Sequence, residues 1–147
     1  MTVEELRALG AVYPEDIQQG FMEYAYEVRK SDQQQTYDTI RRKWEEGGKQ
    51  NVYTDFYYFA LSSDEREKVD QLLTGEEQEH LRELRRVMEQ ENRSVKEHII
   101  FPLDEMLLQI VAKLNEADAL YSTICILDEN CAWWGNFGKE YVIFRKR

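Results

Sequence analysis

Two histidines and two cysteines are the side chains best suited to metal binding or nucleophilic catalysis. His80 and His98 are eighteen residues apart in a segment whose pattern predicts one long helix. Eighteen residues make five helical turns, so the two rings would share a face but lie about 27 Å apart. We therefore do not expect them to bind one metal ion. Glu77 and His80 form a Glu-x-x-His pair, but di-iron bundles use two copies of this motif and the sequence has one.

The cysteines are poorly placed for nucleophilic catalysis. Cys125 lies in an apolar run, where a free cysteine behaves as a small hydrophobic residue. Cys131 is nearer a turn, but Asp128 and Glu129 would raise the pKa of its thiol, whereas catalysis requires a lowered pKa. Gly47-Gly48-Lys49 lacks the flanking residues of a phosphate-binding loop. We expect no metal, no cofactor and no linear catalytic motif.

Acidic side chains are the most prominent chemical feature of the chain. Its 147 residues include 29 Asp and Glu against 19 Lys and Arg, which gives a formal net charge of −10. The acids are concentrated in residues 61–118, which carry a net charge of −7, whereas residues 119–147 carry +1. Such a charge disfavours phosphate backbones and anionic membranes and favours a basic protein. We expect neither a nucleic acid nor a membrane as the partner.

Two sets of residues are candidates for binding a basic protein partner. One is the acid-rich stretch 64–83, and the other is Trp133-Trp134, because exposed Trp is enriched at binding hot spots. The candidate acids are Asp64, Glu65, Glu67, Asp70, Glu76, Glu77, Glu79 and Glu83. Acids in a first helical turn also stabilise the helix dipole, so a solvated helix face would explain part of this set. Adjacent strand residues point to opposite faces, so two covering layers are needed to bury both tryptophans.

Apolar spacing predicts three helices in the first third of the chain. They cover residues 3–9, residues 14–28, and a segment that starts near a Ser31–Gln34 capping box and ends at Gly47-Gly48. The second helix begins at Pro14, which suits a first helical position. Its apolar face would consist of Ile17, Phe21, Tyr24 and Val28.

The middle of the chain predicts one strand and three helices. Residues 52–61 are mostly aromatic or apolar at both odd and even positions, which indicates a strand buried on both faces, with a helix as the alternative. Capping boxes at Ser62–Glu65 and Thr74–Glu77 start two helices, the second of which is expected to reach about residue 98. A clearly amphipathic helix covers residues 103–114.

The end of the chain predicts a meander of three antiparallel strands. The strands are residues 121–127, 131–134 and 141–144, separated by turn-forming residues at 128–130 and 135–138. The sequence thus predicts a single α+β domain over residues 1–147, mostly helical. Its small antiparallel sheet would contain the meander, with residues 52–61 as an optional further strand.

Charge, size and the lack of catalytic motifs favour a small acidic binding protein that neutralises a basic protein partner. By analogy, this suggests an immunity protein or antitoxin against a toxin such as a nuclease. Two alternatives stay open: an enzyme whose pocket between sheet and helices uses no linear motif, and a module that self-associates through a Trp patch. The chain has no long apolar stretch, acids where a signal peptide carries bases, and two cysteines, so we expect a cytoplasmic protein.

Overall fold

One antiparallel sheet organises the structure. The computed structural model describes residues 1–48 and 50–147. Within them the strand order is β1-β6-β5-β4-β2-β3. The strands are β1 (Ala25–Lys30), β2 (Val52–Asp55), β3 (Ile100–Pro102), β4 (Thr123–Ile126), β5 (Cys131–Asn136) and β6 (Glu140–Arg145). The helices are α1 (Val3–Ala8), α2 (Ile17–Glu23), α3 (Gln33–Gly47), α4 (Ser63–Asp70), α5 (Gly75–Gln90) and α6 (Glu105–Glu116). The predicted single α+β domain is confirmed.

The predicted C-terminal meander is also confirmed. β4 pairs with β5 and β5 pairs with β6, both antiparallel. Trp133 lies between Ile124 and Ile143, and Trp134 lies between Thr123 and Val142. Because neighbours along a strand point to opposite faces, this register sends the two tryptophans to different sides of the sheet.

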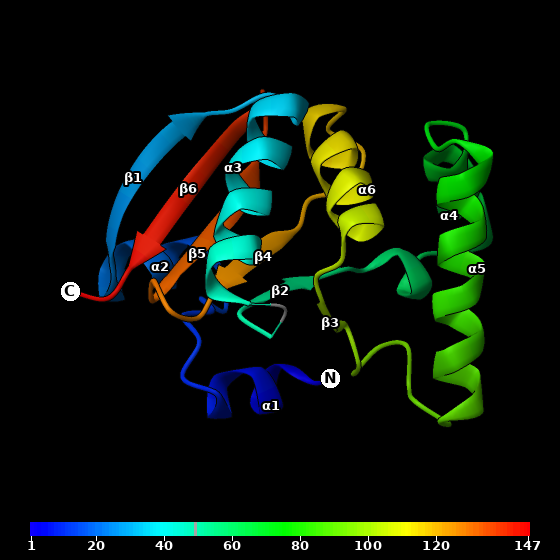
Figure 1. The fold of residues 1–147 in the computed structure, drawn as a ribbon, viewed down its shortest axis with the longest axis horizontal. Coiled ribbons are helices and arrows are strands. Elements are labelled where there is room, and N and C mark those ends of the chain that lie inside the picture. Colours follow the sequence, from blue (N-terminus) through cyan, green and yellow to red (C-terminus); the bar gives the residue numbers. More distant parts are fainter. Residues whose placement is uncertain (49) are drawn as a thin grey trace.

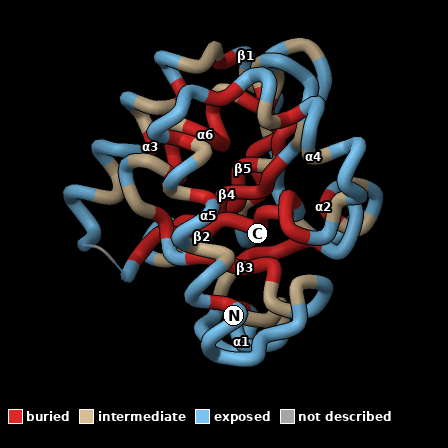
Figure 2. Tube along the Cα trace, turned by 90° about the vertical axis from the view of Figure 1, so that its right-hand side faces the viewer, coloured by how far each residue is buried: buried red, intermediate tan, exposed pale blue. Residues whose placement is uncertain are grey.

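The sheet is covered on both faces. α3 and α6 lie side by side against one face, where Ile40, Leu114 and Trp133 belong to the larger core cluster (Figure 1). On the other face, α1, α2 and the segment after α1 form a smaller cluster that includes Leu6 and Phe144. Figure 2 shows the buried chain concentrated in the sheet between these layers. α4 and α5 stand beside the sheet, next to α6 (Figure 1).

The predicted helix over residues 14–28 is wrong in its second half. α2 ends at Glu23, Tyr24 is extended (φ −123°, ψ 155°), and β1 follows directly. Tyr26 and Val28 point to one face of β1 and alternate with charged residues, and pairing with β6 along the whole strand outweighs the helical spacing. α2 also starts later than predicted, because its N-cap is Asp16.

Three other boundaries differ from the sequence prediction. The cap of α3 is an Asp32–Gln35 box, one residue after the predicted pair. Only Val52–Asp55 of the predicted strand 52–61 is a strand, and Tyr58–Ala60 is a 3-10 turn (η1). α5 ends at Gln90, and Asn92 adopts a left-handed conformation (φ 55°). His98 therefore lies outside the helix that carries His80, and the predicted shared helical face is wrong.

Candidate functional site

The acids predicted to bind a partner lie on α4 and α5, where several already have partners within the chain. Six are exposed and Asp70 is partly buried, whereas Glu77 is buried. Glu79 pairs with Arg82 at 2.7 Å, and Glu83 pairs with Arg86 at 2.6 Å. The remaining contacts are those of Asp70, which accepts a hydrogen bond from Tyr58, and Glu65, which accepts one from the Ser62 backbone in a capping box. Asp64, Glu67 and Glu76 have no ion-pair partner among the described residues.

Glu77 is a structural residue that joins α5 to α6. Its carboxylate accepts hydrogen bonds from the Thr74 backbone (2.8 Å), Gln109 (2.9 Å) and Lys113. Burial alone would raise the pKa of Glu77, but these hydrogen bonds outweigh burial and lower the pKa. Glu77 is thus not part of any partner-binding surface in this structure.

The two tryptophans of β5 point to opposite faces of the sheet, each towards a different covering layer. Trp133 is 1 % exposed and contacts the Tyr141 ring at 5.5 Å between centroids. Trp134 is partly buried on the other face and lies 6.3 Å from the Phe144 ring. Neither is a protruding anchor, but Trp134 also lines a small pocket.

That pocket, here called the tyrosine–aspartate pocket, lies where β2 and β5 end and β4 begins. Its volume is about 240 Å³. The lining residues used below are Tyr13, Glu15, Asp55, Tyr57, Tyr121, Ser122 and Trp134. They come from the segment before α2, the ends of β2 and β5, and the loop before β4. The sheet thus gathers carboxylates and aromatic rings from distant parts of the sequence.

Asp55 is the chemical centre of the pocket. Its Oδ2 accepts a hydrogen bond from the Tyr13 hydroxyl at 2.7 Å, and its Oδ1 accepts one from the Thr123 backbone at 2.7 Å. The Tyr13 and Tyr57 hydroxyl oxygens are 3.4 Å apart. Burial raises the pKa of Asp55 to about 6, although the bonds from Tyr13 and Thr123 oppose the rise. Burial also raises the pKa of Tyr13, and the neighbouring Asp55 carboxylate adds to this rise.

The remaining pocket residues favour a cation. Glu15 adds a second carboxylate, and the residues Tyr57 and Tyr121 are 39 % and 37 % exposed. The buried Ser122 Oγ has no hydrogen-bond partner among the described residues. None of the lining residues is Lys or Arg. Aromatic faces and carboxylates together attract guanidinium and ammonium groups.

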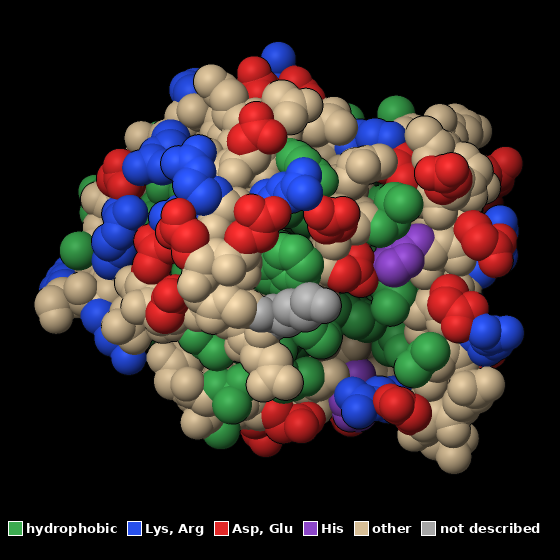
Figure 3. All heavy atoms as spheres, in the orientation of Figure 1, with side chains coloured by type: hydrophobic (Ala, Val, Ile, Leu, Met, Phe, Trp, Pro, Cys, Tyr) green, Lys and Arg blue, Asp and Glu red, His purple; other side chains and the backbone are tan. Residues whose placement is uncertain are grey.

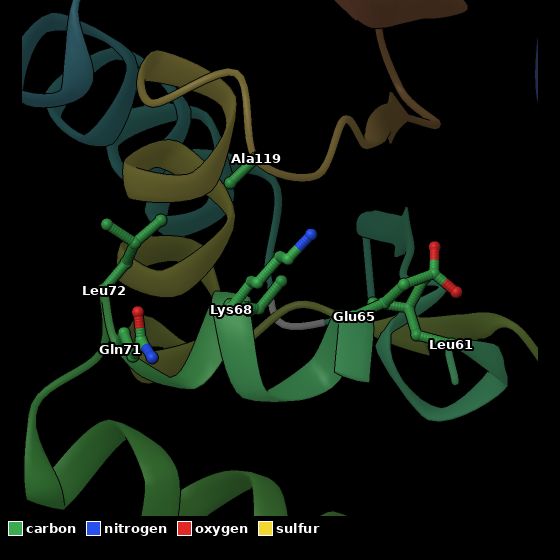
Figure 4. A pocket seen from close by; sticks show the side chains of 7 residues that line it. Leu61, Glu65, Lys68, Gln71, Leu72 and Ala119 are labelled. Atoms are coloured by element: carbon green, nitrogen blue, oxygen red, sulfur yellow. The ribbon is translucent and has the colours of Figure 1, made fainter. Parts of the chain in front are cut away.

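A second hollow, of about 370 Å³, is lined by residues of α4 and of the segments before and after it. Leu61 and Ala119 line it, and they lie close in sequence to Tyr57 and Tyr121 of the tyrosine–aspartate pocket. Its α4 side carries Glu65 and Lys68 (Figure 4). Because Lys68 already supplies a positive charge here, this hollow is less suited to a cation.

The histidines and cysteines are in different environments. His80 Nε2 lies 3.1 Å from Asp104 Oδ2, and both cysteines are buried free thiols. Burial, more than the neighbouring acids, raises the pKa of Cys131 to about 11, and burial also raises the pKa of Cys125. No group of three His, Cys, Asp or Glu side chains within residues 1–48 and 50–147 is placed to hold a metal ion.

Sequence reasoning missed the tyrosine–aspartate pocket because no linear motif connects its residues. One signal was present: Asp55 is the lone acid in the otherwise apolar and aromatic run of residues 52–61. A buried acid needs hydrogen-bond partners, and here Tyr13 and Thr123 provide them.

No helix in the described parts of the chain has the length and apolar character needed to cross a membrane. Comparison of the chain with protein-family models, with curated proteins and with solved structures found no match.

Proposed function

We propose that the protein binds and neutralises a basic protein partner by accepting one of its Arg or Lys side chains in the tyrosine–aspartate pocket. An immunity protein or antitoxin, acting in the cytoplasm on a toxin such as a nuclease, is the class that fits this role. The observation that carries the proposal is the buried Asp55 carboxylate in a pocket that partly exposed tyrosines and Glu15 also line, with no Lys or Arg among the lining residues.

Pocket size favours a side chain over a whole metabolite. Small-molecule sites usually occupy about 300–1,000 Å³, and the tyrosine–aspartate pocket has about 240 Å³. Each carboxylate oxygen has two lone pairs, so Asp55 can accept further hydrogen bonds beyond those from Tyr13 and Thr123. A guanidinium group could then stack on Tyr57 or Tyr121.

Acids on α4 and α5 support attraction of a basic protein at longer range. Asp64, Glu67 and Glu76 are exposed and lack ion-pair partners among the described residues. Figure 3 shows acidic side chains along α5, interspersed with Lys and Arg, while basic side chains gather towards α3 and the β1–β6 side. Such an uneven charge orients an approaching basic protein and raises its association rate.

The test compares two peptides of equal length: one with a central Arg among Lys residues, and one with citrulline at the central position. Citrulline keeps the shape of Arg but removes its charge. We expect the Arg peptide to bind more tightly by calorimetry, and Tyr121→Ser to remove about fivefold of that advantage, the amount expected for one cation–π contact. Phe137→Ser is the matched control, because Phe137 is 72 % exposed and does not line the pocket. Equal affinity for the two peptides would contradict the proposal.

A further inference from the structure

β1 is an outer strand whose second edge has no strand beside it in the described part of the chain. It pairs with β6 over six residues and contains no Pro. Natural edge strands are usually short, bulged, charged or covered, because an open edge can pair with another strand. β1 is long enough for a partner strand, and its outer face is partly apolar.

Exposed apolar side chains gather around this edge. Tyr26 is 55 % exposed and Val28 is 53 % exposed, on the same face of β1. From α2, Phe21 packs on Tyr26 with ring centroids 4.6 Å apart, and Met22 is 75 % exposed. These four residues are here called the edge patch, and none of them lines the tyrosine–aspartate pocket.

Charge complementarity points to a second copy of this chain as the occupant. In a symmetric antiparallel pair whose two sheets share their faces, one residue faces its own copy across the two-fold axis, and the pairing is centred on that residue. Centring on Glu27 or on Arg29 places like charges opposite each other, which is destabilising. Centring on Val28 places Val28 opposite Val28, Glu27 opposite Arg29 of the second copy, and Tyr26 opposite Lys30 of the second copy.

The side chains in β1 already have the positions that this register requires. Glu27 and Arg29 are on the face opposite to the edge patch, where Glu27 contacts Arg29 at 3.1 Å and Arg145 at 2.7 Å. In the paired arrangement, each Glu27 gains a third arginine, Arg29 of the second copy, across the axis. Tyr26 gains a Lys30 that can lie over its ring.

We propose that two copies of the chain dimerise by antiparallel pairing of their β1 strands, centred on Val28, to form one continuous sheet of twelve strands. The six-stranded sheet of each copy supplies half of it. Pairing of two strands buries a small area, so the dimer forms in a concentration-dependent way. This proposal does not rest on the proposed function, because no residue of β1 lines the tyrosine–aspartate pocket.

Sedimentation equilibrium tests the dimer. The mass is expected to rise from 17.6 kDa towards about twice that value as concentration increases. Val28→Lys should shift dissociation to at least tenfold higher concentration, because the Val28-centred register would place two lysines directly opposite each other. Phe137→Lys is the control, since Phe137 is exposed and lies in the β5–β6 turn. Melting curves establish that both variants fold. A wild-type mass that stays at one chain up to about 1 mM overturns the proposal.

Cysteine cross-linking tests the register. Facing residues in an antiparallel pair have Cα atoms about 4.5–5.5 Å apart, within the range of a disulfide. Val28→Cys should therefore oxidise to a covalent dimer. Tyr26→Cys should do so at least tenfold more slowly, because Lys30 of the second copy faces it. The native cysteines are buried and do not compete. Equal rates for the two variants would overturn the Val28-centred pairing.

Discussion

Glu77 of α5 and Lys113 of α6 form an ion pair whose carboxylate is completely buried, with side-chain exposures of 0 % and 21 %. The neighbouring pairs on α5, such as Glu79–Arg82, remain in solvent, with exposures of 69 % and 64 %. One helix thus carries two kinds of carboxylate. The buried one fixes the position of α5 against α6, and the exposed ones contribute little to that position.

Replacing Lys113 with Met is expected to destabilise the protein by about 3–5 kcal/mol, because it leaves the Glu77 charge buried without its cation. Arg82→Met is the matched control and should cost about 1 kcal/mol or less, since its pair with Glu79 is exposed. Urea unfolding at neutral pH measures both. Similar losses of unfolding free energy in the two variants would show that the Glu77–Lys113 pair does not hold α5 in place.

The buried Asp55 predicts an unusual pH dependence of stability. Its pKa is raised from an ordinary 3.8 to about 6, so the folded state binds a proton more tightly than the unfolded state. The contribution of Asp55 to stability is therefore fully present below about pH 4 and is lost as the pH rises through 6. The shift corresponds to a loss on the order of 3 kcal/mol.

Asp55→Asn isolates this contribution, because Asn has a similar shape and does not ionise. We expect the stability of Asp55→Asn relative to the wild type to increase between pH 4 and pH 7, as measured by urea unfolding at several pH values. Glu77, whose pKa is lowered, acts in the opposite direction in both proteins and cancels in the difference. A difference that stays constant with pH would contradict the raised pKa.

The features that the sequence predicted correctly depend on local patterns. The Ser62–Glu65 and Thr74–Glu77 boxes place side chains and backbone within one helical turn, and both start helices as predicted. The α2–β1 boundary was missed, because helical spacing continues through Val28 and the strand is selected by pairing with distant β6. Likewise, an acid at the third helical position looks the same in sequence whether it is exposed, as Glu65 is, or buried against another helix, as Glu77 is.

A close approach between α2 and β6 makes Gly20 intolerant of a larger side chain. A Cβ at Gly20 would lie 2.5 Å from the ring of Phe144, which also packs against Phe21 and Trp134. Gly20→Ala should therefore destabilise by about 1–3 kcal/mol despite the better helix propensity of Ala. At Gly75, a Cβ meets no atom within 4 Å, so Gly75→Ala should be neutral or stabilising. Unfolding in guanidinium measures the stability of both variants. Equal changes in their unfolding free energies would argue against tight packing at Gly20.

Charge reversals should separate binding from stability, if the proposed function holds. Glu67→Lys and Glu76→Lys remove exposed acids that lack ion-pair partners among the described residues, so both should slow association with a basic protein. Glu67→Lys should leave the free energy of unfolding nearly unchanged, whereas Glu76→Lys should lower it by about 1 kcal/mol or less, because Glu76 lies in the first turn of α5. Glu129→Lys in the meander breaks a 2.8 Å contact with Lys43 and should mainly lower stability, by about 1 kcal/mol or less.

Stopped-flow measurements of association at rising ionic strength test whether the Glu67→Lys and Glu76→Lys variants bind a basic protein more slowly. The rates of wild type and helix variants should converge as salt screens the field. A rate independent of salt, or equal slowing by Glu129→Lys, would show that the acids of α4 and α5 do not guide the partner.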